Sequence, residues 1–218
     1  MDPKKYRAQM QALLSPAEKK ILQKLSTPKK IQDYLDTLKV NFEVDGETLM
    51  SPRRVMRTGR AHCIEAALLA AAALAYHGRP PYLMDFQTRE YDEDHVVAIF
   101  EDNGLWGAIS KTNHAMLRWR DGVYASPREL AMSYFHEYTM SDGRKTMLAY
   151  SEPFNMRQYK LEQWLTVEEN MEWFADDIDE APHSPAAPKN ILRTLRPTAP
   201  IERKILLLVE QKDPRKKE

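Results

Sequence analysis

The chain is poor in cysteine and glycine. Cys63 is the only cysteine among 218 residues, so no disulfide can form within the chain, and this agrees with a reducing compartment. No cysteine–histidine cluster has the spacing of a zinc site. The seven glycines form neither of the common Gly-rich phosphate-binding patterns. We therefore expect no bound metal and no cofactor.

The chain also lacks an excess of charge and a long apolar segment. Its 32 Lys and Arg residues balance its 32 Asp and Glu residues, which gives no electrostatic reason to expect nucleic acid or an acidic membrane surface as a partner. No apolar run approaches the roughly 18–20 residues of a membrane span, and residues 1–6 lack the apolar core of a signal peptide. We expect a soluble, cytoplasmic protein without nucleic-acid or membrane partners; the oligomeric state is not predicted.

The length suits one compact core with an appendage. We expect a core at 1–150 that begins with helices, and a helical, proline-interrupted extension at 151–218 packed on it. Helix starts are predicted where a Ser or Thr precedes Glu by three residues, or precedes Pro: Ser15, Thr27, Ser126 and Thr166. The stretch 176–200 carries five prolines, which predicts an extended surface connection.

The middle of the chain changes from a helical pattern to a strand pattern. The alanine-rich run 61–76 predicts a central buried helix that ends at His77-Gly78. Beyond it, the short apolar runs 82–86, 95–100 and 105–110 predict strands, the last two joined as a hairpin. Together these patterns predict the α+β class.

The hairpin places polar residues together. A four-residue loop puts His95 opposite Ser110, and a two-residue turn puts it opposite Thr112; because side chains alternate, both registers place all three on one face. A three-residue loop would bring Lys111 to that face instead.

Cys63 falls about one turn into the predicted helix. Unpaired amides and the positive end of the helix dipole favour a thiolate there and can stabilise an oxyanion. A histidine on a strand against that helix could take the thiol proton, and a third group would orient the imidazole. Cys63, His95 and position 110 occur in this order.

Structural roles are the competing interpretation. A lone cysteine in an alanine-rich helix is commonly a packing residue, which predicts a sulfur more than about 6 Å from either nitrogen of the imidazole. His95 could be a half-exposed polar residue at a strand start. His62 projects about 100° away from Cys63 and is expected to line the cleft or cap the helix.

Three segments carry a resemblance: GRAHCIEAA at 59–67, DHVVA at 94–98 and WGAISKT at 106–112. Over roughly residues 55–115 the chain resembles the transglutaminase-like superfamily. The resemblance implies a papain-like core, in which a cysteine helix packs on an antiparallel sheet, and a Cys-His-Asp triad that serves transamidases, peptidases and amide hydrolases. Cys63 matches the nucleophile and His95 the base. Where the family has aspartate, proline and threonine, this chain has serine, lysine and threonine, starting at Ser110.

Two functions follow. The first is a thiol-dependent acyl-transfer enzyme, a hydrolase or a transamidase, that acts on a peptide or small amide through Cys63, His95 and Ser110. Substitutes for Ser110 as the orienting group are Asp94, Asp102, Asn113 and Glu65. The alternative is a catalytically impaired domain that binds a peptide or small amide in the same cleft.

Overall fold

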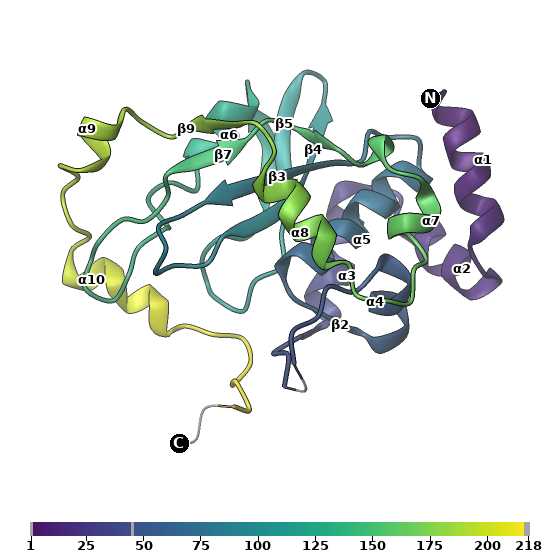
Figure 1. The fold of residues 1–218 in the computed structure, drawn as a ribbon, viewed down its shortest axis with the longest axis horizontal. Helices are drawn as coiled ribbons and strands as arrows, with labels where there is room; N and C mark the ends of the chain where they lie inside the picture. Colours follow the sequence, from purple (N-terminus) through teal and green to yellow (C-terminus); the bar gives the residue numbers. More distant parts are fainter. Residues whose placement is uncertain (1, 45, 216–218) are drawn as a thin grey trace.

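The structure is a computed structural model that describes residues 2–44 and 46–215. Residues 1, 45 and 216–218 of the ranges expected above lie outside it. The described chain is α+β, with ten α-helices, a seven-stranded sheet and a two-stranded sheet (Figure 1). The helices are α1 (Pro3–Leu13), α2 (Pro16–Lys24), α3 (Pro28–Thr37), α4 (Pro52–Thr58), α5 (Cys63–Tyr76), α6 (Pro127–Met132), α7 (Leu161–Trp164), α8 (Glu172–Asp179), α9 (Lys189–Leu192) and α10 (Pro200–Arg203), with 3-10 turns η1 (Met156–Gln158) and η2 (Lys204–Leu207).

The large sheet is antiparallel and has the order β6-β5-β4-β3-β7-β9, with β8 also paired to β3. Its strands are β3 (Tyr82–Gln87), β4 (His95–Asp102), β5 (Leu105–Ile109), β6 (Arg120–Tyr124), β7 (Ala149–Ser151), β8 (Phe154–Asn155) and β9 (His183–Pro185). The small sheet pairs β1 (Lys39–Val40) with β2 (Arg60–Ala61) in parallel. The predicted strands β3, β4 and β5 are confirmed, whereas β6 to β9 were not predicted.

Side chains of β4 alternate between two cores. Val96, Ala98 and Phe100 pack in the core that contains α5, and Val97 and Ile99 pack in the core that contains α6. The sheet therefore separates two hydrophobic layers, as the period of two along a strand requires when both faces are covered.

Helix α5 is the centre of the larger core. Every residue from Ile64 to Tyr76 is buried. The helix packs on strands β3 and β4 of the sheet and also contacts α1, α2, α3 and α4 (Figure 1). Its alanines allow this close approach. The expected start at Ala61 is wrong, because Arg60 and Ala61 pair with β1 and the helix begins at Cys63.

The N-terminal helices have the predicted caps and one unpredicted member. The side chains of Ser15 and Thr27 cap α2 and α3 as expected. Helix α1 was missed, since it offers the core chiefly Tyr6 and Met10, too few apolar positions to form a clear stripe.

Two predictions for the C-terminal part are wrong. Thr166 starts no helix, because the carbonyls of Leu165 and Val167 accept hydrogen bonds from the Arg53 amide and the Ser51 hydroxyl; α8 begins at Glu172. The stretch 176–200 is not merely a connection, because it completes α8 and supplies the edge strand β9, where prolines are tolerated. The expected boundary after residue 150 falls inside β7.

Candidate active site

The β4–β5 hairpin positions the histidine. Asp102 pairs with Leu105, so Asn103 and Gly104 form a two-residue turn, and both have the positive φ of such turns, 53° and 79°. The predicted shared face is confirmed, since Nε2 of His95 lies 2.9 Å from Oγ of Ser110. His95 is 6% exposed, which contradicts the interpretation of a half-exposed strand cap.

The Ser110 hydroxyl fixes the tautomer of His95. Its Oγ donates to the carbonyl of Leu117, at 2.5 Å, and a hydroxyl has only one hydrogen. Ser110 must therefore accept its second hydrogen bond from the Nε2–H of His95. A neutral His95 then carries its lone pair on Nδ1, which is the nitrogen available to the thiol.

Gln32 of α3 holds the Ser110 backbone. Its Nε2 donates to the Ser110 carbonyl at 2.8 Å, and its Oε1 accepts from the Ser110 amide at 2.9 Å. These bonds replace strand pairing at the point where β5 ends. Sequence reasoning missed this residue, which lies 78 positions earlier and carries no local signal for the contact.

Cys63 is the first residue of α5 and is half-buried. The first ladder bond of the helix runs from the Ala66 amide to the His62 carbonyl, so the amides of residues 63–65 precede the ladder. Burial raises the pKa of the Cys63 thiol, but hydrogen bonds and charge interactions with His62 and His95 hold that pKa well below its usual value. The electrostatic influence of two imidazoles on this thiol favours a reactive cysteine over a packing cysteine.

His62 is the unexpected second imidazole. As expected it lines the cleft and occupies the N-cap position, although its side chain makes no capping bond. Its Nε2 donates to the Thr48 carbonyl at 2.8 Å and lies 3.5 Å from Glu65 and 3.8 Å from Glu43. Burial lowers the pKa of His62, but the interactions with Cys63 and Glu65 raise it to about 9. A cationic His62 is therefore favoured at neutral pH, and its charge favours the thiolate form of Cys63.

Glu65 organises this corner from a fully buried position. Its carboxylate accepts hydrogen bonds from the amides of Met50 and His62, at 2.8 and 3.0 Å, and from the side chains of Asn41 and Thr48, both at 3.1 Å. The spacing of three between His62 and Glu65 is the sequence signal that could have revealed the pair.

The other candidates for orienting His95 have different partners. Asp94 accepts from Thr88, Asp102 pairs with Arg79 at the far end of β4, and Asn113 bonds to Gln211, whereas Glu65 serves His62 as described. Ser110 is thus the hydroxyl that the fold places against this imidazole.

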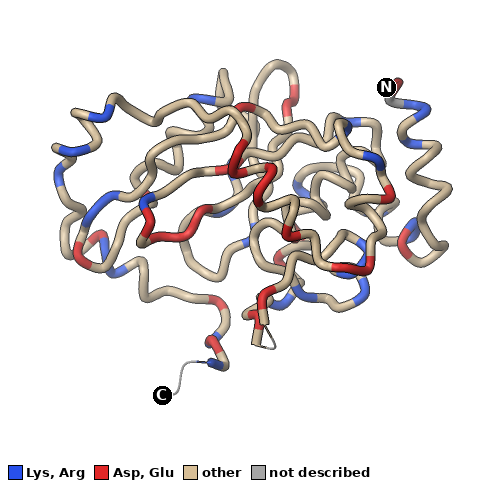
Figure 2. Tube along the Cα trace, viewed as in Figure 1, with Lys and Arg blue, Asp and Glu red and all other residues tan. Residues whose placement is uncertain are grey.

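Cys63 opens into a pocket of about 720 Å³. One wall is the β3–β4 connection, an acidic segment in Figure 2, and another is the C-terminal segment, which Asn113 and Gln211 bind to the loop after β5. Prominent lining residues are Phe42, His62, Asp92, His95, Lys111 and Val209. The pocket is large enough for a peptide side chain with its flanking backbone.

No model of a known protein family matches the chain, and no curated protein sequence matches it. Among the helices of the described residues, none is long and apolar enough to cross a membrane.

Proposed function

We propose that the protein is a thiol-dependent acyl-transfer enzyme that acts on an amide or peptide, with Cys63 as nucleophile, His95 as acid and base, and Ser110 as the group that positions the imidazole. The observation that carries the proposal is the bridging place of His95, which bonds to Ser110 through Nε2 and interacts with Cys63. The proposal includes a papain-like, transglutaminase-like core and a cytoplasmic location, supported by the helix-start cysteine and by the absence of a second cysteine.

Acylation needs a thiolate and a proton donor. The Cys63 sulfur attacks the carbonyl carbon of the substrate, a C–S bond forms, and the carbonyl electron pair moves to oxygen. The amides at the start of α5 supply the hydrogen bonds to this oxyanion. His95 has taken the thiol proton of Cys63 on Nδ1, and when the C–N bond breaks it donates this proton to the leaving amine, so that a thioester on Cys63 results.

Deacylation reverses the roles. Neutral His95 removes a proton from water or from an incoming amine, which attacks the thioester carbonyl. The C–S bond then breaks and the thiolate returns to its place between the two imidazoles. Water yields hydrolysis and an amine yields transamidation.

One observation favours a second candidate, a catalytically impaired domain that binds the same ligands. Ser110 supplies a hydrogen-bond acceptor to His95 but no negative charge to stabilise an imidazolium. In a serine protease, replacing the triad carboxylate by its amide costs about 10⁴ in turnover, although papain-like enzymes function with an asparagine. This candidate predicts ligand binding that survives Cys63→Ala and no covalent adduct.

A peptide pool tests for chemistry. Wild type and Cys63→Ala are incubated with the pool in ¹⁸O-labelled water with a labelled primary amine, and the products are read by mass spectrometry. We expect ¹⁸O in new carboxyl groups or amine adducts with wild type alone. The first product indicates hydrolysis and the second indicates transfer.

A chloroacetamide probe tests the site without knowledge of the substrate. Labelling of Cys63 should depend on His95, so wild type and His95→Ala should differ in rate. If both variants react as slowly as a free thiol, and the peptide pool yields no product, the enzymatic proposal is rejected in favour of the binding domain.

A further inference from the structure

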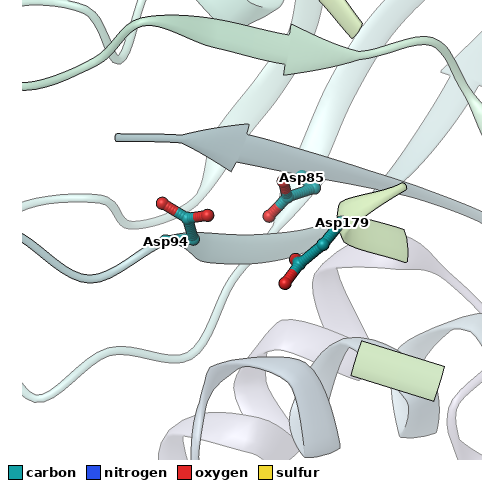
Figure 3. Close-up of side chains that lie close together, drawn as sticks. All are labelled: Asp85, Asp94 and Asp179. Carbon is teal, nitrogen blue, oxygen red and sulfur yellow. The ribbon is translucent and has the colours of Figure 1, made fainter. Parts of the chain in front are cut away.

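Three aspartates gather where β3, the start of β4 and the end of α8 meet (Figure 3), and one of them, Asp94, also lines the cysteine pocket. One carboxylate oxygen of each of Asp85, Asp94 and Asp179 lies within 4.8 Å of the others. Asp85 is fully buried, whereas Asp94 and Asp179 are exposed. The group therefore has a closed floor and an open mouth, which would let an ion enter from solvent.

The floor contains a polar atom without a partner. Oδ2 of Asp85 bonds to Nε2 of His183 at 3.0 Å, but Oδ1 has no hydrogen-bond partner among the residues that the structure describes. A buried carboxylate oxygen without a donor is costly, and such an atom calls for an unseen ion or water. The buried member of the cluster therefore keeps one carboxylate oxygen that no protein donor of the described residues occupies.

His183 neutralises only one of the three charges. Its Nδ1 donates to the carbonyl of Ala181 at 2.6 Å, so the Nε2 that faces Asp85 can carry a second hydrogen only in the imidazolium form; otherwise the proton lies on Asp85. In both cases the pair is neutral overall, and the charges of Asp94 and Asp179 are left. Within residues 2–44 and 46–215, no lysine or arginine forms a salt bridge with the three aspartates.

The local backbone adds to the negative field. Asp179 is the last residue of α8, at the end of a helix where the dipole is negative and a carboxylate is unfavourable. Gln87 of β3 nevertheless donates its Nε2 to the Asp179 carbonyl at 3.2 Å and holds the helix end there. Thr88 likewise orients Asp94 through two hydrogen bonds to its Oδ1, of 2.7 and 2.8 Å.

We propose that Asp85, Asp94 and Asp179 bind one divalent cation of the hard, oxygen-preferring class, such as Ca²⁺, Mg²⁺ or Mn²⁺. Carboxylates suit these ions, and two oxygens on opposite sides of one such ion are about 4–5 Å apart, which the cluster matches. The ion would satisfy Oδ1 of Asp85, neutralise the charges of the other two aspartates and join α8 to the β3–β4 pair. His183 is not a ligand, since both of its nitrogens are engaged in hydrogen bonds.

Mn²⁺ titration followed by electron paramagnetic resonance tests the proposal, because bound Mn²⁺ loses the sharp signal of the free ion. We expect one site per chain with a dissociation constant below about 1 mM, and at least about a tenfold weaker site in Asp94→Asn and Asp179→Asn. The matched controls Glu93→Gln, in the same acidic loop, and Glu172→Gln, at the other end of α8, should bind Mn²⁺ as wild type does. Both control residues are exposed and lie outside the cluster.

Competition and stability complete the test. Ca²⁺ or Mg²⁺ should displace Mn²⁺, and Mn²⁺ should raise the melting temperature of wild type but not of Asp179→Asn. Removing a carboxylate from a helix C-terminus is not expected to impair folding, so this variant stays informative if Asp94→Asn fails to fold. Absence of binding at about 1 mM Mn²⁺, or equal binding by wild type and the two aspartate variants, would overturn the proposal.

Discussion

Nε2 of His95 lies 2.9 Å from Oγ of Ser110, and that hydroxyl donates its only hydrogen to the Leu117 carbonyl. Ser110 therefore orients the imidazole by accepting a hydrogen bond from it, and donates none to it. The charge that a carboxylate would supply is missing on this side, whereas the interaction of His95 with Cys63 helps to hold the pKa of that thiol below its usual value.

Removing that acceptor should slow the chemistry without abolishing it. We expect Ser110→Ala to lower the rate of Cys63 labelling by chloroacetamide by about 10-fold, less than the roughly 10²- to 10⁴-fold typical of losing an acid–base group, as in His95→Ala. Equal losses in the two variants, with both folded by circular dichroism, would indicate that Ser110 does more than position the ring.

The reactivity of Cys63 should extend to acidic pH. Because His62 and His95 hold the thiol pKa well below its usual value, the alkylation rate should begin to fall at a lower pH than that of an ordinary thiol, whose pKa is about 8.5 and whose rate falls about tenfold per pH unit below it. His62→Ala should move the midpoint of this profile towards 8.5. A wild-type midpoint near 8.5 would contradict the interaction with the two imidazoles.

The ionisation of His62 and Cys63 should also make the stability of the fold depend on pH. The folded pKa of His62, about 9, exceeds the unfolded 6.5, so its contribution is complete below pH 6.5 and is lost as the pH rises through 9. The folded pKa of Cys63 is lowered, so its contribution is present above about 8.5 and is lost as the pH falls towards the folded value. The opposing slopes cancel between about pH 6.5 and 8.5.

We therefore expect the free energy of unfolding contributed by the pair to be level in that window. It should fall between about pH 8.5 and 9 on the alkaline side, and on the acidic side as the pH approaches the folded pKa of Cys63, with a slope of at most about 1.4 kcal/mol per pH unit. Urea denaturation of wild type and Cys63→Ala from pH 5 to pH 10 measures the contribution as a difference. A difference that rises steadily across the whole range would show that the two groups do not titrate as a pair.

Glu65→Gln should destabilise the fold strongly. The new amide group must face either the Met50 amide or the His62 amide, and both are donors, so one buried bond becomes a donor–donor contact. We expect a loss of about 3 kcal/mol in unfolding free energy by urea denaturation. Glu47→Gln, an exposed change in the neighbouring loop, is the control and should leave stability within about 0.5 kcal/mol.

Local sequence patterns were sufficient to predict those features that depend on residues close together in the chain. The period of two along a strand placed His95 and Ser110 on one face for either a two-residue or a four-residue loop, and the alanine run marked the helix that carries Cys63. The Asn103-Gly104 turn, a local feature, then selected one of the three loop lengths considered and excluded the one that would have brought Lys111 to this face.

Contacts between distant segments were beyond those patterns. The pairing of Arg60 and Ala61 with β1 moved the helix start to Cys63, which placed the sulfur at the first amides and His62 at the N-cap. The hydrogen bond between Gln32 and Ser110 joins residues 78 positions apart, and the one between Asp85 and His183 joins residues 98 positions apart. Periodicity reports which face a residue occupies, whereas the partner across that face depends on how the separate elements pack. Cys63 and His95 could therefore be selected from the sequence as a candidate pair, but the place of the second imidazole, the hydrogen bonds of Gln32 to Ser110 and the aspartate cluster became visible only in the folded arrangement.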